Sequence, residues 1–393
     1  MALGALIAAY VEDDSGGLRA LLPLAGRTLV EYQVRCASAA GAAPILVLVE
    51  RVPQALQDAF ERLRIEGIGV FPVGDVHEAV SRFEAGSTIL LIGDGIAPPA
   101  ALVEQLAEDP ESTVATVPDD EAHAAFERID AQSRWAGVSV IEGELLSSTA
   151  RMLGDWDLQS TLLRRAIQEG AARAPVSEGM EPVLAEEPGQ LAEFQRGLLA
   201  GSRVERSDAA SRFVLPPIED WATEQLVESQ VRPEWLLWTA VGLTLAAAAT
   251  FLGGWLGVGI GLLIVSTPLD LVASRLAAVR LRPLPARYWA RRALWPLAGL
   301  ALVALGWWEW RNATGWGAIV TALAAAAFAH AAVLERNTPP GDWDLWLFSR
   351  RNAILLGFPF ALLGAWTAYL VLLLAYSGTS FFLIQKLRRA LPG

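Results

Sequence analysis

The feature that most constrains this chain is a change in hydropathy past its midpoint. From Trp235 onward the sequence runs through long apolar stretches that are nearly free of charge. Residues 235–393 hold 5 acidic and 13 basic side chains, whereas residues 1–234 hold 38 and 18. The first part therefore carries a charge near −20 and the second near +8, within a total of −12. An acidic part followed by a basic, apolar part indicates a cytoplasmic domain joined to a membrane domain.

Six apolar runs in the second part have the composition of membrane spans, although several are short for the roughly 20 residues that a spanning helix needs. They are Trp235–Leu252, Leu256–Leu269, Leu294–Trp308, Gly317–Leu334, Ala353–Leu363 and Trp366–Ile384. Nearly all basic residues lie after the second, fourth and sixth runs. By the positive-inside rule we expect both termini in the cytoplasm and a multi-pass protein of a bacterial-type inner membrane.

Composition excludes several kinds of site. A single cysteine, Cys36, allows neither an internal disulfide framework nor a cysteine-rich metal site. The only lysine in the sequence is Lys386, so the chain contains no P-loop motif. The acidic first part also argues against nucleic acid as a partner. Any phosphate chemistry in that part must use arginine, backbone amides or carboxylates that hold a metal.

The first 175 residues alternate strand and helix patterns. Apolar, β-branched or leucine-rich runs predict buried strands, and helical patterns lie between them. We expect strands at Ala2–Val11, Pro44–Val49, Gly67–Val73, Thr88–Ile92, Ser112–Val117 and Ala136–Ile141, and helices at Thr28–Ala40, Pro53–Arg64, Val76–Glu84 and Ala100–Glu108. This order predicts a doubly wound, mainly parallel α/β sheet, in which ligands bind beyond the carboxyl ends of the strands.

Two segments at that edge carry candidate site residues. After the first strand come Gly16, Gly17 and Arg19 and then the stretch Leu21-Leu-Pro-Leu-Ala-Gly-Arg27, and after the fourth strand comes Asp94 within Gly-Asp-Gly. This combination resembles the sugar-phosphate and alditol-phosphate nucleotidyltransferases. The resemblance implies that Gly16, Gly17 and Arg19 bind nucleotide phosphates. It also implies that Asp94 helps to hold the Mg²⁺ or Mn²⁺ ion that bridges the triphosphate.

The first of these segments departs from the family pattern. It is shorter than in the family and contains Glu12, Asp13 and Asp14, which would repel a triphosphate unless metal or arginine offset them. A second metal-holding carboxylate is missing, apart from Asp155 and Asp157, which are candidates by position only. Alternatives stay open in which the glycines form an ordinary turn and Asp94 is a helix cap or loop residue. The departures favour loss of nucleotide transfer.

Residues 176–234 have the composition of an acidic linker. Near its end, Glu219–Gln230 has apolar residues at helical spacing, and an amphipathic helix directly before a first span is expected to lie on the membrane surface. The expected division is therefore residues 1–175 for the α/β domain, 176–234 for the linker and juxtamembrane helix, and 235–393 for an all-α bundle of six spans.

This order of parts resembles the bifunctional inositol-1-phosphate cytidylyltransferase and di-myo-inositol-phosphate phosphate synthase proteins, whose membrane half belongs to the CDP-alcohol phosphatidyltransferases. In that family four aspartates hold divalent cations against the CDP pyrophosphate. Of that motif this chain keeps one aspartate, Asp270, and the arginine, Arg275, whereas Arg292 stands in place of the last aspartate. The resemblance implies Asp270 and Arg275 as catalytic residues and Asp270 as a metal ligand.

Two hypotheses of function result. In the first, the protein is a divergent CDP-alcohol phosphotransferase fused to a nucleotidyltransferase, works in phospholipid or polar-headgroup metabolism on a CDP-alcohol or nucleotide, and has impaired or lost catalysis. In the second, it is a non-catalytic membrane partner that binds a lipid headgroup or nucleotide and associates with an active relative. A homodimer is implied by the resemblance alone.

Four arginines of the second part are candidates for binding a phosphate or a membrane lipid headgroup at the cytoplasmic surface. They are Arg275, Arg287, Arg291 and Arg292. The alternative is that these residues only set the topology of the spans.

Overall fold

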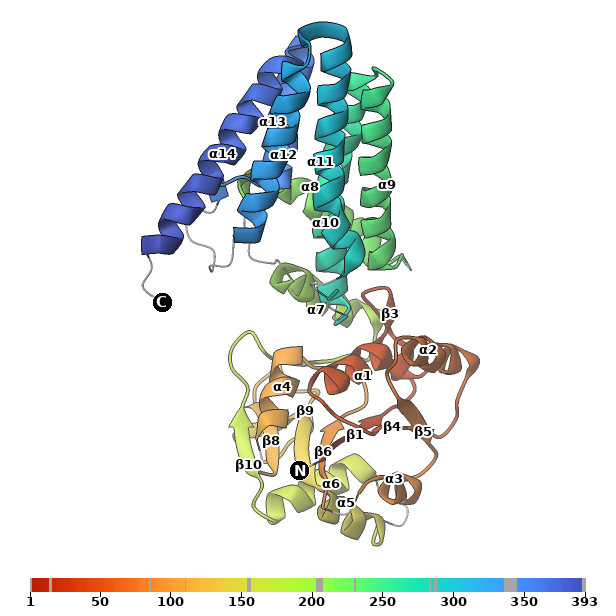
Figure 1. The fold of residues 1–393 in the computed structure, drawn as a ribbon. Coiled ribbons are helices and arrows are strands. Elements are labelled where there is room, and N and C mark those ends of the chain that lie inside the picture. Colours follow the sequence, from red (N-terminus) through yellow and green to blue (C-terminus); the bar gives the residue numbers. More distant parts are fainter. Residues whose placement is uncertain are drawn as a thin grey trace. The chain divides into compact units, whose positions relative to one another are not determined.

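The computed structural model describes residues 2–13, 16–84, 86–109, 111–153, 157–202, 208–229, 231–282, 284–285, 288–335 and 345–390. The chain forms two compact units, which are drawn in Figure 1. One comprises Met1–Gly201 with Val279–Arg282, and the other Ser202–Ala278 with Pro283–Gly393.

A seven-stranded sheet forms the centre of the first unit. Its order is β10-β8-β9-β6-β1-β4-β5. The strands are β1 (Leu3–Ala8), β4 (Ile45–Leu48), β5 (Val70–Val73), β6 (Thr88–Ile92), β8 (Thr113–Pro118), β9 (Ser133–Glu142) and β10 (Ala172–Pro175). All neighbours pair in parallel except β9, which runs antiparallel to both β6 and β8. The predicted doubly wound, mainly parallel sheet is confirmed.

Helices cover both faces of this sheet (Figure 1). On one face lie α1 (Leu29–Ala39), α2 (Gln54–Ile65) and α4 (Ala100–Glu108), and on the other α3 (Val76–Arg82), α5 (Gly143–Ala150) and α6 (Leu158–Gln168). Strand β1 is apolar throughout because its alternate side chains enter two cores: Ala5 and Ile7 pack with the first set of helices and Leu6 with the second.

Short elements complete the first unit. They are the 3₁₀ turn η1 (Arg19–Leu21), the strand pairs β2 (Pro23–Leu24) with β3 (Arg27–Thr28) and β7 (Ile96–Ala97) with β11 (Val183–Leu184), and helix α7 (Pro188–Gly201). Leu191 of α7 is 1% exposed and belongs to the core on the α1 face. Helix α7, which the sequence places in the linker, is therefore packed as part of the α/β unit.

The second unit is helical. Its elements are the π-helical turn η2 (Ala210–Val214), α8 (Pro216–Val227), α9 (Pro233–Leu252), α10 (Leu256–Val279), α11 (Trp289–Glu309), the π-helical turn η3 (Trp310–Thr314), α12 (Gly317–Glu335), α13 (Arg350–Leu363) and α14 (Trp366–Ala390). Many large apolar side chains on the outer faces of these helices are exposed, among them Val265, Leu323 and Leu363. Such faces suit contact with lipid rather than water.

Four described helices are long and apolar enough to cross a membrane: α9, α10, α12 and α14. The prediction of six spans is therefore wrong in number. Helix α13 has 14 residues, which give about 21 Å of helix against a hydrocarbon core of about 30 Å. Helix α11 has 21 residues, but Arg291 and Arg292 in its first turn lower its mean hydropathy. The second unit is thus consistent with a membrane region, whereas the cytoplasmic location of both termini stays a prediction.

Small residues set the packing of the bundle. Ala301, Ala304, Ala322 and Ala325 are buried between helices α11 and α12 and their neighbours. A Cβ atom added at Gly306 of α11 would lie 2.5 Å from the Cβ of Ala322 of α12, so only glycine permits this approach.

Helix α10 contains a proline. Pro268 has no N–H group and cannot donate to the carbonyl of Ile264, one turn earlier in α10. The Thr267 hydroxyl donates to that carbonyl instead, at 2.6 Å. The helix therefore passes the proline with this carbonyl satisfied.

Candidate functional site

The parallel pairing of β1 and β6 brings the two predicted candidate segments together at one edge of the sheet. Asp94 follows β6, and one of its carboxylate oxygens accepts hydrogen bonds from the backbone N–H groups of Tyr10 (2.6 Å) and Val11 (2.8 Å), which follow β1. Its other oxygen is buried and has no hydrogen-bond partner within the described residues. Asp94 therefore connects the segment after β6 to the segment after β1, and its second carboxylate oxygen is available to accept a hydrogen bond.

A pocket of about 240 Å³ lies against Asp94. Tyr10 donates its hydroxyl hydrogen to Asp157 at 2.9 Å and accepts a hydrogen bond from Gln159 at 2.7 Å. Asp157 is also the N-cap of α6, since it accepts from the N–H of Ser160. This network holds one wall of the pocket, and Phe126 and Trp135 belong to its apolar lining.

The pocket is acidic. Its described lining includes Asp94, Glu127 and Asp157 and contains neither arginine nor lysine. Burial raises the pKa of Asp94 to about 6, against the opposing effect of the two backbone N–H groups. Burial also raises the pKa of Glu127. The lining therefore disfavours a phosphate group and suits a small molecule that carries no negative charge.

The glycine segment after β1 is closed on itself. The N–H of Gly16 donates to the backbone oxygen of Asp13 at 3.0 Å, and the N–H of Gly17 donates to the Asp13 side chain at 2.8 Å. The N–H of Asp13 donates in turn to the oxygen of Gly17 at 2.6 Å. Gly16 has φ +78°, which permits this tight turn. The two amides that the resemblance assigns to phosphate binding thus serve the turn itself.

Arg19, the other residue that the resemblance assigns to phosphate, is bound to a carboxylate. Its guanidinium donates to Glu186 at 3.0 Å. Its Nε is buried and has no hydrogen-bond partner within the described residues. An incoming phosphate would compete with Glu186 for this side chain.

The first unit supplies few described carboxylates for the Mg²⁺ or Mn²⁺ ion that the resemblance implies. Within the described residues, no cluster of three or more His, Cys, Asp or Glu side chains is arranged to hold a metal. Asp94 supplies one available oxygen, whereas Asp157 already accepts from Tyr10 and Ser160. Asp155 lies outside the described residues. Magnesium usually keeps several waters and binds through one or two carboxylates together with substrate phosphates, so among the described residues Asp94 would be the candidate ligand.

In the second unit Asp270 is bound by two arginines of α13. Its oxygens accept from Arg351 at 2.6 Å and from Arg350 at 3.3 Å, and the carboxylate is 6% exposed. Arg351 also donates to Asp208 at 2.6 Å. These four residues form a buried charge cluster, which we call the Asp270 cluster. Metal binding at Asp270 would require both arginines to leave.

Arg275, which the family motif places in one site with Asp270, is bound to other residues. Its guanidinium contacts Asp220, lies 3.5 Å from Glu219, and donates through Nε to Ser202 at 3.2 Å. Arg275 is 4% exposed. It therefore fastens α8 to α10, and the two residues that the resemblance treats as one site have separate partners.

The other candidate arginines lie at the start of α11 or beyond the described residues. Arg291 and Arg292 occupy the first turn of α11, where Arg292 is exposed. Arg287 lies outside the described residues. A role for these residues in headgroup binding stays a prediction.

The sequence reasoning missed Asp208, Arg350, Arg351, Tyr10 and Gln159. Arg350 and Arg351 were assigned to topology because they are adjacent bases between two apolar runs, and Asp208 lies 143 residues from its partner Arg351. No local pattern marks such a pair. Tyr10 and Gln159 had a usable signal, since Tyr10 lies two residues after β1 and Gln159 is the second residue of α6, at the predicted ligand edge.

Comparison with known proteins supports the first unit only. Residues 15–201 match the family model of the MobA-like NTP transferase domain. No curated protein matches the chain significantly. Similar solved structures include CTP:phosphocholine cytidylyltransferase from Streptococcus pneumoniae, with 15% identity, a TM-score of 0.38, and coverage of 50% of this chain and 99% of that chain. A putative glucose-1-phosphate thymidylyltransferase from Bacillus anthracis has 13% identity, a TM-score of 0.38 and coverage of 50% and 94%.

Proposed function

We propose that this protein is a membrane-associated relative of the nucleotidyltransferases that has lost nucleotide transfer and acts by binding. Its first half has the nucleotidyltransferase fold, and its second half carries four apolar helices long enough to span a membrane. The observation that carries the proposal is the closed turn after β1, in which Asp13 takes the amides of Gly16 and Gly17. Nucleotide phosphates would have to displace the Asp13 carboxylate from the amide of Gly17 and the Asp13 backbone oxygen from the amide of Gly16.

The pocket beside Asp94 suits this role. It retains about 240 Å³ of space with ordered polar walls, so it can still bind a small molecule. Because its described lining is acidic, the expected ligand is a polyol or an amine rather than a phosphate ester. We propose that this binding serves polar-headgroup metabolism at a bacterial-type inner membrane and that the protein associates with an active relative.

The alternative is a working CDP-alcohol phosphotransferase with Asp270 as its metal-holding residue. The pairing of Asp270 with Arg350 and Arg351 weighs against that alternative, because both carboxylate oxygens are already bound to guanidinium groups. The arginine that the family motif retains, Arg275, is bound to Asp220 and Ser202.

The test measures nucleotide binding by the full chain in detergent, with CTP and either MgCl₂ or MnCl₂. We expect no rise in the thermal midpoint. If CTP did bind, a free concentration 100-fold above its Kd would stabilise the folded protein by about 2.7 kcal/mol. Asp13→Ala frees the amide of Gly17, and we expect this variant to bind CTP more tightly than the unmodified protein. Asp109→Ala, on the loop after α4, is the matched control.

Two results would contradict the proposal. One is stabilisation of the unmodified protein by CTP and metal that Asp94→Asn abolishes. The other is release of CMP from a CDP-alcohol that is lost in Asp270→Asn, which would favour the alternative. Co-purification with a nucleotidyltransferase or phosphatidyltransferase that has complete motifs would support the binding role.

A further inference from the structure

The second unit contains a cavity that neither the closed turn nor the Asp270 cluster explains. It has a volume of about 330 Å³ and is lined by residues of α9, α10, α11, α12, α13 and α14. This volume is at the lower end of the range for sites that bind small molecules. Its walls are formed almost wholly by apolar side chains, among them Phe251, Leu263, Leu302, Leu305 and Leu373.

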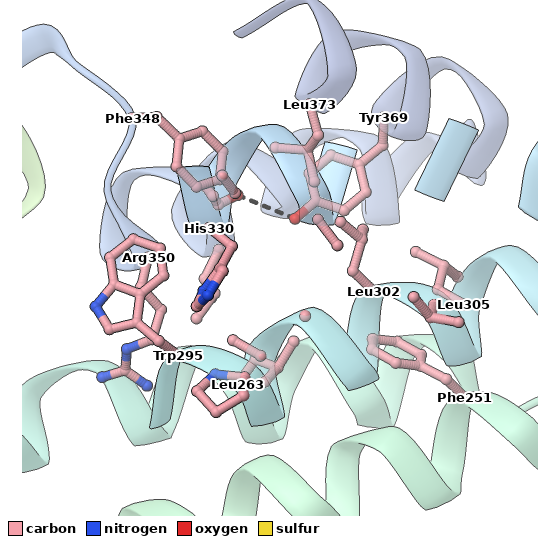
Figure 2. A pocket seen from close by; sticks show the side chains of 18 of the residues that line it. Phe251, Leu263, Trp295, Leu302, Leu305, His330, Phe348, Arg350, Tyr369 and Leu373 are labelled. Carbon is pink, nitrogen blue, oxygen red and sulfur yellow. Dashed lines mark hydrogen bonds between the residues drawn. The ribbon is translucent and has the colours of Figure 1, made fainter. Parts of the chain in front are cut away.

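One end of the cavity is polar (Figure 2). Arg350 and His330 lie at this end beside Trp295, whereas Phe251 and Leu305 lie at the opposite end. The cavity thus has the polarity of an amphiphile, with a place for a charged head and a place for an apolar chain.

Arg350 is the group that points to a ligand. Its side chain is 6% exposed, its Nη2 donates to Asp270 at 3.3 Å, and its Nη1 is buried without a hydrogen-bond partner among the described residues. A buried guanidinium N–H that lacks an acceptor is costly, so an acceptor is expected there. Because Arg350 lines the cavity, a ligand in the cavity is in position to supply one.

The local charge favours an anion. Asp270 and Asp208 are balanced by Arg350 and Arg351, and Arg291 is near enough to add a further positive influence on Asp270. His330 at the same end is exposed, and its imidazole can donate a hydrogen bond. An anionic head would therefore meet net positive charge and an unused donor.

The position of the cavity indicates how the chain of the amphiphile enters. Pro296 of α11 and His330 of α12 line the cavity and are exposed, in helices whose outer faces are apolar. An apolar chain can therefore pass between lipid and cavity without crossing water.

We propose that this cavity binds a single-chain anionic amphiphile, with its carboxylate or phosphate on Arg350 and its hydrocarbon chain along Phe251, Leu263 and Leu302. This inference concerns the helical unit and does not depend on the loss of nucleotide transfer in the α/β unit.

The test uses the full chain in detergent micelles and measures saturable binding of tritiated palmitate by scintillation proximity, with empty micelles as background. Hexadecanol has the same chain without charge, and inorganic phosphate has the charge without the chain. We expect saturable binding of palmitate. Hexadecanol should compete at least about tenfold less effectively than unlabelled palmitate, and inorganic phosphate should not compete.

Variants locate the two ends of the site. Arg350→Gln should weaken palmitate binding by about tenfold or more and leave competition by hexadecanol unchanged, while Arg311→Gln serves as the control. Ala329→Phe fills the cavity and should abolish palmitate binding even if Arg350→Gln does not fold. Leu323→Phe, on the same helix but 50% exposed, is its matched control.

Three results would overturn the inference. Equal competition by hexadecanol would remove the role of the anion, and competition by inorganic phosphate would show a site for free anions. Unchanged palmitate binding in Ala329→Phe, together with reduced binding in Leu323→Phe, would place the ligand on the outer surface of the helices.

Discussion

Each unit buries an aspartate beside its candidate site, but the two carboxylates have different partners. Asp94 in the α/β unit is 7% exposed and accepts from two neutral backbone N–H groups. Asp270 in the helical unit is 6% exposed and accepts from two guanidinium groups. Backbone dipoles do not fully offset desolvation, so the proton binds more readily at Asp94. Two full charges allow Asp270 to remain an anion inside the bundle.

The strongest way to break this comparison is to remove the charge of Asp270. Asp270→Asn leaves Arg350 and Arg351 buried with less negative charge, and breaking a buried pair costs about 3–5 kcal/mol. We expect a large fall in the thermal midpoint of the full chain in detergent. Asp220→Asn, which alters the 30% exposed partner of Arg275, should cost less. Equal effects of the two substitutions would show that burial does not govern the Asp270 cluster.

Removing the charge of Asp94 should have the opposite sign. The pKa of this carboxyl is about 6 in the folded protein, against a reference value of 3.8. Between these pH values the folded chain binds more protons, so the free energy of unfolding falls as pH rises and is constant above the window. The shift is worth about 3 kcal/mol. Asp94→Asn should therefore raise the thermal midpoint at pH 7.5 and leave it nearly unchanged below pH 4.

A second aspartate of the α/β unit provides the control for that pH dependence. Asp130 is exposed to solvent, and hydrogen bonds from Gln132, Arg173 and Ser133 lower its pKa to about 2. Its contribution to stability is present above the unfolded pKa and is lost as pH falls toward 2. Asp130→Asn should therefore lower the thermal midpoint at pH 7.5 and leave it nearly unchanged near pH 2, so its effect at pH 7.5 has the opposite sign to that of Asp94→Asn. Identical profiles for the two variants would contradict the assignment of Asp94.

The smallest expected effect compares helix caps in the two units. The Ser349 side chain accepts from the N–H of Asn352 at 3.0 Å at the start of α13, and Asp75 accepts from the N–H of Glu78 at 2.8 Å at the start of α3. Replacing either residue by alanine should cost about 1 kcal/mol. Chemical denaturation measures both losses. A markedly larger loss for Ser349→Ala would show that this cap also positions Arg350 and Arg351.

The fold of the α/β unit was predictable because each strand and helix is marked by a pattern within a short stretch of sequence. Apolar runs such as Thr88–Ile92 show the buried strands directly, and the parallel arrangement then places Asp94 beside the residues that follow β1. The antiparallel strand β9 was less accessible, since the direction of a strand depends on its connections rather than its composition.

The site in the helical unit was predictable only in part. The family motif pointed to Asp270, but its partners Arg350 and Arg351 lie on α13, far away in the sequence. The same motif pointed to Arg275, but in the folded unit this side chain contacts Asp220 of α8. The count of spans failed for a different reason: the short run Ala353–Leu363 was counted as a span, although its helix, α13, has only 14 residues.

Pro268 has a consequence for the Asp270 cluster. The ladder bond that the proline removes from α10 is replaced by the hydroxyl of Thr267, a side chain that can follow the backbone when the helix bends. Helix α10 therefore lacks one backbone hydrogen bond at Pro268, two residues before Asp270. Because the arginines that hold Asp270 belong to α13, any bending of α10 at Pro268 would change the distances between Asp270 and these arginines. The curvature of α10 at Pro268 would thus be linked to the ion pairs of the Asp270 cluster.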